Sequence, residues 1–168
     1  VNDAPVVDAI AQSYIDEDTA LSLDVSATDV DGDDLSYSSS SGSFDGSILT
    51  ITPEADWNGT DEVTVTVSDG NGGETSVTFT LVVTPVNDAP RLDELLDASV
   101  AEDNEYTLEL DGEDIDGDAL IFSASVAENG SASVEGSTLT VTSDQDFNGD
   151  LVVNVLASDG QASGSGSF

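Results

Sequence analysis

A five-residue repeat constrains this chain more than any other feature of its sequence. Val1–Pro5 reads Val-Asn-Asp-Ala-Pro, and the same letters return at Val86–Pro90, 85 positions later. The two copies match at this offset as far as Ser123. After about five extra residues in the second copy, they match again at an offset of 90 from Leu139 to Gly160. A fixed period of this kind identifies a unit that is repeated along an array. The sequence therefore predicts two tandem modules.

Short stretches that alternate apolar and polar residues recur through both copies, separated by turns rich in Gly and Asp, and no helical pattern accompanies them. In the first copy they cover 6–10, 21–27, 35–37, 48–52, 63–67 and 77–83, and in the second copy 106–110, 120–122, 139–141 and 152–156. Such spacing predicts an all-β fold of two tandem antiparallel Greek-key β-sandwiches with about seven strands each.

The predicted division places the first module at 1–85, a linker at 86–90 and the second module at 91–168. The second copy has little that matches 77–83, so its last strand is expected to be truncated. A missing strand leaves the neighbouring edge unpaired, and we expect that end to fray or to borrow a strand.

The chain is strongly acidic, with 36 Asp and Glu residues against one basic residue, Arg91, and a formal charge of −35. Nucleic acid is therefore excluded as a partner, because neutralising phosphates requires clustered Lys and Arg. There is no Cys, so the modules must be held by core packing or by a metal. No apolar run approaches the ~20 residues of a membrane span, and no signal sequence opens the chain. We interpret it as a piece excised from a longer exported protein.

Acidic residues occupy matched positions in the two copies, at the ends of predicted strands. The pairs are Glu17 with Glu102, Asp29 with Asp114, Asp31 with Asp116, Glu54 with Asp144, Asp56 with Asp146, and Asp69 with Asp159. This placement brings several carboxylates to one pole of each sandwich, where two charges about 4 Å apart repel by roughly 4 kcal/mol at a dielectric of about 20. Calcium binds sets of carboxylate and carbonyl oxygens, whereas zinc and copper prefer the His and Cys that this chain lacks.

The segments Asp29–Asp33 and Asp114–Asp118 read Asp-x-Asp-Gly-Asp. They differ from a helix-loop-helix calcium loop, because the glycine comes one position early and strands flank them. Two hypotheses stay open for them: that each is an ordinary Asp-rich turn, or that each supplies metal ligands.

Several motifs taken together resemble those of cadherin and bacterial cadherin-like repeats. Ala27–Gly32 followed by Leu35–Ser38 resembles the cadherin Asp-x-Asp segment before its Tyr-Ser strand. Glu54–Asp56, thirteen residues ahead of Asp69, is similar to the Asp-Arg-Glu motif with its acids exchanged. The linker Thr84–Pro90 resembles the Asp-x-Asn-Asp-Asn linker, with one residue fewer before the proline and with a proline at position 85, where an acid is usual.

The resemblance implies calcium ions bound between successive modules, which are thereby stiffened. Carried over by position, the ligands at the central junction would be Glu17, Glu54, Asp56, Asn87, Asp88, Asp114, Asp116 and Asp159. Half-sites facing further modules would comprise Asp3, Asp29, Asp31 and Asp69 at one end and Glu102, Asp144 and Asp146 at the other. The implied function is that of calcium-rigidified spacer and adhesion units of a secreted bacterial surface protein, with neighbouring repeats of the same protein as partners.

Trp57 and Phe147 occupy matched Asp-aromatic-Asn-Gly turns. They are interpreted either as plugs over the end of the core or as stacking platforms for a sugar ring. The second interpretation makes a calcium-dependent carbohydrate-binding module, with a polysaccharide or another cell surface as partner, the alternative function. An enzyme is disfavoured, because the acids recur in both copies, whereas a catalytic pair of carboxylates is needed only once.

Overall fold

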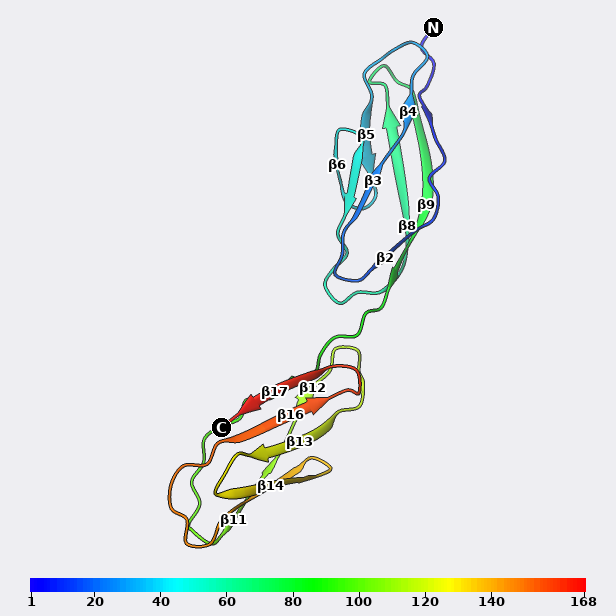
Figure 1. The fold of residues 1–168 in the computed structure, drawn as a ribbon. Helices are drawn as coiled ribbons and strands as arrows, with labels where there is room; N and C mark the ends of the chain where they lie inside the picture. The colour runs from blue at the N-terminus through cyan, green and yellow to red at the C-terminus, as the bar shows by residue number, and fades with distance from the viewer. The chain divides into compact units, whose positions relative to one another are not determined.

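The structure, a computed structural model, describes residues 1–168 and divides into two compact units, Val1–Val86 (unit 1) and Asn87–Phe168 (unit 2). Both units consist of strands and loops without helices, which confirms the predicted all-β class (Figure 1). No segment therefore forms an apolar helix long enough to cross a membrane. Residues 87–90 belong to unit 2, and a separate linker at 86–90 stays a prediction.

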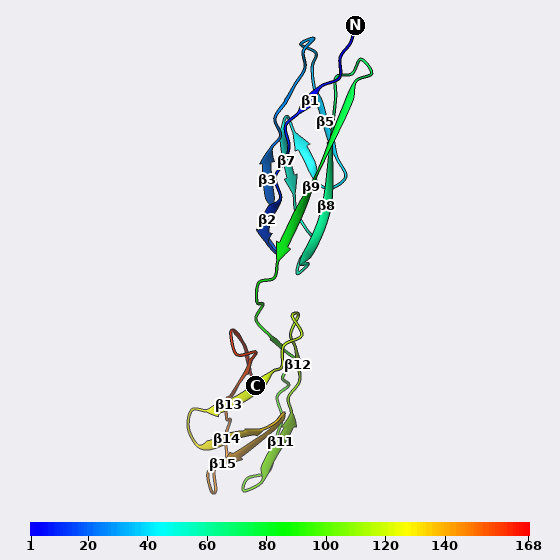
Figure 2. The same cartoon turned by 90° about the vertical axis from the view of Figure 1, so that its right-hand side faces the viewer.

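Unit 1 is a sandwich of two sheets, and Figure 2 shows its strands running lengthwise with the loops at the two ends. One sheet has the strand order β2 (Ser13–Asp16), β9 (Glu74–Thr84), β8 (Gly59–Ser68) and β5 (Ser36–Ser39). The other has the order β3 (Leu21–Asp24), β7 (Ile48–Ile51) and β6 (Ser43–Asp45), and β1 (Val6–Val7) pairs with β4 (Ala27–Thr28). All pairs are antiparallel except β2 with β9, which is parallel.

Unit 2 repeats this plan with fewer paired residues. Its sheets have the orders β11 (Glu105–Glu109), β15 (Thr138–Ser143), β14 (Gly130–Glu135) and β13 (Ile121–Val126), β16 (Val153–Ser158), β17 (Ser163–Ser167), and β10 (Arg91–Leu92) pairs with β12 (Gly112–Glu113). The last strand spans 5 residues against 11 in β9. No strand in unit 2 corresponds to β2. The truncated last strand expected from the sequence is thus present in its first half only.

The sequence pattern missed six strands, namely β2, β6, β10, β12, β14 and β17. Of these, β14 and β17 consist largely of Ser, Gly and Ala. In β17 the reason is visible in the packing. Gly164 leaves no room for a Cβ against the carbonyl oxygen of Pro90, and Gly166 lies against Leu95. Glycine is unfavourable in strands, but it permits such close approach of two chain segments. Tertiary contacts therefore select these residues, and alternation does not reveal them.

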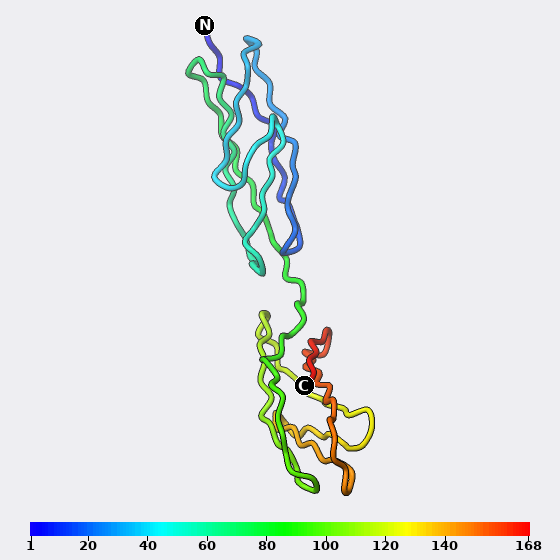
Figure 3. The backbone as a smooth tube through the Cα atoms, turned by 90° about the vertical axis from the view of Figure 1, so that its left-hand side faces the viewer, coloured from blue at the N-terminus to red at the C-terminus, as the bar shows by residue number.

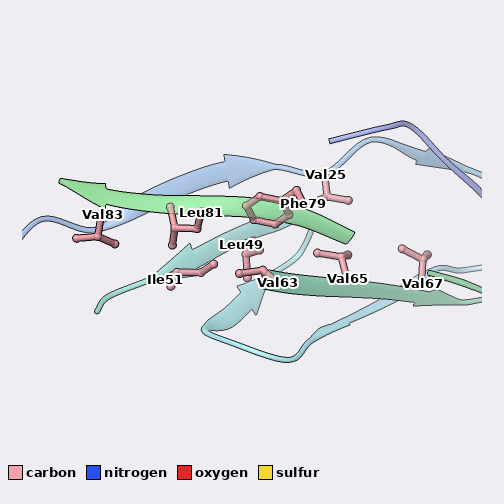
Figure 4. Close-up of a cluster of buried hydrophobic side chains, with 9 residues drawn as sticks. All are labelled: Val25, Leu49, Ile51, Val63, Val65, Val67, Phe79, Leu81 and Val83. Atoms are coloured by element: carbon pink, nitrogen blue, oxygen red, sulfur yellow. The ribbon is translucent and has the colours of Figure 1, made fainter. Parts of the chain in front are cut away.

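The core of unit 1 lies between its two sheets (Figure 4). Alternate residues of β8 and β9 point inward, so Val63, Val65 and Val67 on β8 and Phe79 and Leu81 on β9 share the inner face of their sheet and are almost fully buried. Leu49 on β7 closes the core from the opposite sheet with no exposed surface. Unit 2 has a smaller core of the same kind, which contains Leu110, Leu139, Val141, Val153 and Val155.

Replacing Leu49 by Ala should destabilise unit 1 by about 2–5 kcal/mol, because it removes a fully buried side chain and leaves a cavity. Trp57 is the only tryptophan and lies in unit 1, so its fluorescence during urea unfolding reports on that unit alone. Leu139→Ala is the matched control in unit 2 and should leave the Trp57 transition in place. An unchanged urea midpoint in Leu49→Ala would contradict this account of the core.

Candidate functional site

One end of unit 1 gathers acidic side chains from three separate parts of the chain. They come from the first three residues, from the loop after β4 and from the loop between β8 and β9, and Figure 3 shows both loops at the same end as the N-terminus. We call this end the N-terminal pole of unit 1, and its members are Asn2, Asp3, Asp29, Asp31, Asp33 and Asp69.

Asp29 organises the first loop of this pole. Its Oδ1 accepts hydrogen bonds from the backbone amides of Asp31 at 2.8 Å and Asp33 at 3.4 Å. The turn needs a left-handed residue, which Gly32 supplies with a φ of 79°. Oδ2 of Asp29 is buried and has no hydrogen-bond partner. Carboxylate oxygens of Asp29, Asp31 and Asp33 lie within 4.8 Å of one another, which is close enough to share one cation.

Asp69 ties the second loop to the start of the chain. The residue is only 4% exposed. Its Oδ1 accepts the amides of Asn71 at 2.7 Å and Gly73 at 2.9 Å, and its Oδ2 accepts the side-chain amide of Asn2 at 2.8 Å. The hydrogen bond from Asn2, together with the loop amides, lowers the pKa of Asp69 below its usual value, against the opposing effect of burial.

Unit 2 has the same arrangement at its own N-terminal pole, built from residues 85 to 90 positions further on. Oδ1 of Asp114 accepts the amides of Asp116 at 3.0 Å and Asp118 at 3.2 Å, and Gly117 has a φ of 78°. The Asp88 amide donates to Oδ2 of Asp116 at 2.8 Å, as the Asp3 amide does to Asp31 in unit 1. Oδ2 of Asp114 is again buried without a hydrogen-bond partner.

Asp159 takes the place of Asp69 in unit 2. Its Oδ2 accepts the Asn87 side-chain amide at 2.9 Å, and its Oδ1 accepts the amides of Gln161 and Ala162, each at 2.6 Å. The Asn87 hydrogen bond is the largest cause that lowers the pKa of Asp159. The structure thus brings together five of the residues that the sequence suggested as ligands: Asn87, Asp88, Asp114, Asp116 and Asp159.

The opposite pole of unit 1 contains Glu17, Asp18, Glu54 and Asp56. Glu17 is 3% exposed, and it accepts the Val86 amide at 2.5 Å and the Asn58 side-chain amide at 3.1 Å. Oδ1 of Asp18 accepts the Asp56 amide at 3.1 Å. Glu54 lies in the same turn as Asp56, with an exposed side chain.

The corresponding pole of unit 2 repeats one of these contacts. Oδ1 of Asp103 accepts the Asp146 amide at 3.1 Å, as Asp18 does for Asp56. All four of these aspartates have positive φ values between 56° and 60°, which is uncommon for residues with a side chain. Glu102 and Asp144 have exposed side chains, so unit 2 has no buried acid equivalent to Glu17.

The sequence analysis did not predict several residues at the poles, although the repeat relates most of them to a matching residue in the other copy. Asp18 and Asp103 directly follow the matched Glu17 and Glu102, and the same offset of 85 relates them. Others, namely Asn2, Asp33, Asn58 and Asp118, are also repeated but were not selected. The roles of Asn2 and Asn58 as donors to carboxylates depend on contacts between distant segments.

Trp57 and Phe147 each lie over the glycine two positions later. A Cβ on Gly59 would lie 3.1 Å from the Trp57 ring, and one on Gly149 would lie 2.9 Å from the Phe147 ring. Trp57 is 39% exposed and Phe147 is partly buried. The contact of ring on glycine backbone occurs in both units, as expected of plugs that close the end of each sandwich.

Two successive units, each with two sheets packed around an apolar core and with loops at both ends, define a protein of tandem Ig-like β-sandwich modules. The family model of the bacterial Ig domain matches residues 2–82 and 87–167, and the chain belongs to that family. The two matched stretches correspond closely to unit 1 and unit 2. No curated protein matches the chain.

Solved structures with this fold include cadherin ectodomains. Human CDH23 EC21-23 is 17% identical with a TM-score of 0.55, over 99% of this chain and 63% of that one. Protocadherin Gamma B2 extracellular cadherin domains 1-5 is 16% identical with a TM-score of 0.52, over 100% of this chain and 39% of that one. Endo-fucoidan hydrolase MfFcnA4 from glycoside hydrolase family 107 is 20% identical with a TM-score of 0.46, over 98% of this chain and 28% of that one.

The likenesses to the two cadherin ectodomains show the fold, and the cadherin-like architecture expected from the sequence is confirmed at that level. The chain spans less than two thirds of each of these proteins. A linker of the specific cadherin-like type stays a prediction.

Asn87→Ala should raise the pKa of Asp159 towards its ordinary value, because it removes the hydrogen bond that stabilises the ionised form most. The lowered pKa means that Asp159 stabilises the fold above the unfolded-state pKa, and this contribution is lost as the pH falls through the folded-state pKa. Carboxyl carbon NMR titration measures the change directly. Asn2→Ala is the matched control and should shift Asp69 only. An unchanged Asp159 titration in Asn87→Ala would contradict this assignment.

Proposed function

We propose that the chain is a pair of calcium-binding spacer modules of an extracellular bacterial surface protein. The observation that carries this proposal is the buried Oδ2 of Asp114, which has no hydrogen-bond partner and is repeated by Oδ2 of Asp29. A buried acceptor without a partner costs about 1–3 kcal/mol, and more when it is charged. Both equivalent loops leave this oxygen unpaired. A cation that binds the oxygen would supply the missing partner and so explain why both loops keep this arrangement.

Calcium fits these oxygens better than other metals do. The poles offer carboxylates, amide oxygens and backbone carbonyls, and the chain has neither His nor Cys. Calcium takes six to eight oxygens at about 2.3–2.6 Å, so two ligands of one ion stand at most about 5 Å apart. The carboxylate oxygens of Asp29, Asp31 and Asp33 lie within 4.8 Å of one another and meet that condition.

At the N-terminal pole of unit 2, Asp88, Asp114, Asp116 and Asp159 would hold the ion, with the side-chain oxygen of Asn87 nearby. Hydrogen bonds from the loop amides fix the orientation of these carboxylates in advance, which reduces the entropy lost on binding. The lowered pKa of Asp159 keeps that group ionised at neutral pH. Following the resemblance to cadherin repeats, we propose that Glu17, Glu54 and Asp56 of unit 1 complete the same ion site.

Calcium bound in this way would act mechanically. With a formal charge of −35 and one basic residue, the units repel each other unless cations neutralise them. An ion that shares ligands from both units and from residues 86–90 resists bending, because a bend removes oxygens from its coordination shell. We therefore propose that the modules are non-catalytic spacers outside the cell, with neighbouring repeats of the same protein as partners.

Calcium should bind with a dissociation constant of about 10⁻⁴ to 10⁻³ M, as in other extracellular modules, and should stabilise the fold by about 2.7 kcal/mol at a hundredfold excess. Asp114→Asn should weaken binding about tenfold or more, because it removes a charged ligand and keeps the shape of the loop. Calorimetry and thermal unfolding with added calcium measure both effects. Glu135→Gln, an exposed acid on β14, is the control and should bind as the parent does.

Asp29→Asn makes the matched change at the pole of unit 1 and separates two versions of the proposal. If the site needs ligands from a preceding unit, Asp29→Asn should cost less affinity than Asp114→Asn. Equal losses would mean that each Asp-x-Asp-Gly loop binds independently. Absence of calcium heat together with an unchanged melting temperature at millimolar calcium would overturn the proposal.

Calcium should also narrow the range of shapes that the chain adopts in solution. Small-angle scattering in calcium chloride and in sodium chloride at matched ionic strength separates ion binding from charge screening, because screening depends on ionic strength alone. We expect a more extended and less variable particle in calcium. The same maximum dimension and spread in both salts would show that calcium does not control the shape.

Polysaccharide binding remains the alternative function. Trp57 lines a shallow pocket with Glu54 and Asp61, which is a favourable setting for a sugar ring. The packing of the ring on Gly59 nevertheless accounts for Trp57 without a ligand, so the spacer function is preferred.

A further inference from the structure

Unit 1 contains a pocket of about 270 Å³ at the pole that holds Glu54. Its apolar floor includes Ile51 of β7 and Leu81 of β9, which come from opposite sheets and are 3% and 1% exposed (Figure 4). Pro53 adds a further apolar side chain. The rim of the pocket carries one aromatic and two acidic residues, Trp57, Glu54 and Asp61. We call this feature the Trp57 pocket, and every residue of it belongs to unit 1.

Trp57 is held with one face of its ring covered. A Cβ on Gly59 would lie 3.1, 3.5 and 3.6 Å from three atoms of the six-membered ring, so the ring packs face-on against the glycine. The side chain is nevertheless 39% exposed, and this exposure belongs to its other face and its edge. The contact with Gly59 therefore orients the indole and leaves aromatic surface available to a ligand.

Asp61 is an acid on the inward side of its strand. Alternate residues of β8 point into the core, and Val63 and Val65 have no exposed surface. Asp61 continues this row by one step towards the pole, where its side chain is exposed. In the second copy the offset of 90 places Leu151 at this position, and that leucine packs against the core of unit 2. Unit 1 thus has a carboxylate where the repeat has an apolar side chain, and packing does not explain it.

The polar groups of the Trp57 pocket are mainly acceptors. Glu54 and Asp61 supply carboxylates, which only accept hydrogen bonds when ionised. The donors are limited to the indole N–H of Trp57 and the hydroxyls of Ser41 and Thr52. A sugar ring presents hydroxyls that both donate and accept, whereas a guanidinium or ammonium group only donates. The pocket therefore complements an organic cation better than a neutral sugar.

An arginine side chain matches each part of this lining. Its guanidinium is attracted to the face of an aromatic ring, and tryptophan is the strongest partner in such contacts. The same planar group can donate two hydrogen bonds to one carboxylate while it stacks on the ring, which a lysine ammonium does not do. The aliphatic stem of arginine covers apolar surface such as that of Ile51, Pro53 and Leu81.

The occupant has to come from another molecule. The chain has a single basic residue, Arg91, which lies on β10 of unit 2, and unit 1 has none. A second copy could offer only that one arginine among 36 acids, so charge repulsion opposes it. Free arginine has its own carboxylate, which a chain of charge −35 also repels. Within a polypeptide that carboxylate is converted to a peptide bond, and further basic residues add attraction.

We propose that the Trp57 pocket binds an arginine side chain of a separate, basic polypeptide. The guanidinium stacks on the open face of Trp57 and donates to Asp61, and the stem lies on the apolar floor. Glu54 adds negative charge at the rim. This is a partner-binding function in addition to the spacer function, and it depends on Trp57 and Asp61, neither of which is a proposed calcium ligand.

The test uses the 168-residue chain and the peptide acetyl-Gly-Arg-Gly-amide at constant ionic strength. We expect a saturable change in the fluorescence of Trp57, the only tryptophan, at millimolar peptide, with nitrogen-15 amide shifts centred on 51–61. The same peptide with citrulline in place of arginine keeps the size, loses the charge and should give no such change. Equal responses to both peptides, no response, or shifts spread over the whole acidic surface would overturn the proposal.

Two variants localise the binding. Asp61→Asn should weaken the peptide about tenfold or more, because it removes a charged acceptor and keeps the shape of the side chain. Glu62→Gln is the matched control, since it removes the same charge from the next residue of β8, which lies on the opposite face of the strand, and it should bind as the parent does. Equal losses in the two variants would show a response to the general field of the protein and would overturn the assigned location.

Three further titrations distinguish other occupants. Free arginine should bind more weakly than the peptide, and equal affinity would overturn the assignment to a polypeptide. A neutral oligosaccharide that gives the saturable Trp57 response in place of the peptide would identify a sugar site and overturn the proposal. Peptide binding should persist both in a chelator and at millimolar calcium. Loss of binding at millimolar calcium would assign the pocket to the metal, and this outcome too would overturn the proposal.

Discussion

Mutual repulsion of carboxylates is the constraint on which the rest of this structure depends, because one arginine stands against 36 acids. The strands reduce this repulsion by keeping acidic side chains away from the two cores, which contain only aliphatic and aromatic groups. In the loops, backbone amides reduce it by donating hydrogen bonds to the carboxylates. Asp29, Asp69, Asp114 and Asp159 each accept two of them, so their charge is partly compensated before any ion arrives. This compensation leaves one oxygen of Asp29 and one of Asp114 buried without a hydrogen-bond partner.

Comparison of the two units shows which features both of them share and which occur in only one. The Asp-x-Asp loops of the two N-terminal poles use the same hydrogen bonds, with distances that agree within about 0.2 Å. The opposite poles differ, since Glu17 is buried beneath the amide of Val86 while Glu102 is exposed. The edges differ too, because β9 pairs with β2 in unit 1, whereas residues 98–101 form no strand in unit 2. The acidic poles are thus independent of how completely each sandwich is closed.

The sequence by itself determined the fold class, the existence of two repeats and the grouping of matched acids at the ends of strands. Val63, Val65 and Val67 show why, since a two-residue period with β-branched side chains has one low-energy solution, a strand with one buried face. Because each loop occurs twice, acids that recur at the same position can be recognised. This recurrence distinguished Asp114 and Asp116 from the many acids on exposed faces. Local pattern was sufficient wherever neighbours in the sequence are also neighbours in the structure.

Only the tertiary structure decided the features that depend on contacts between distant segments. The side-chain amides of Asn2 and Asn87 reach carboxylates 67 and 72 positions away, and no local pattern reveals such partners. The strands β2 and β17 were missed because β2 is short and pairs in parallel with a strand almost 70 positions away, and because β17 alternates serine with glycine. Which Asp oxygens are buried without a hydrogen-bond partner follows from packing in three dimensions. Burial and backbone pairing belong to the assembled sandwich, and the sequence of one strand cannot specify them alone.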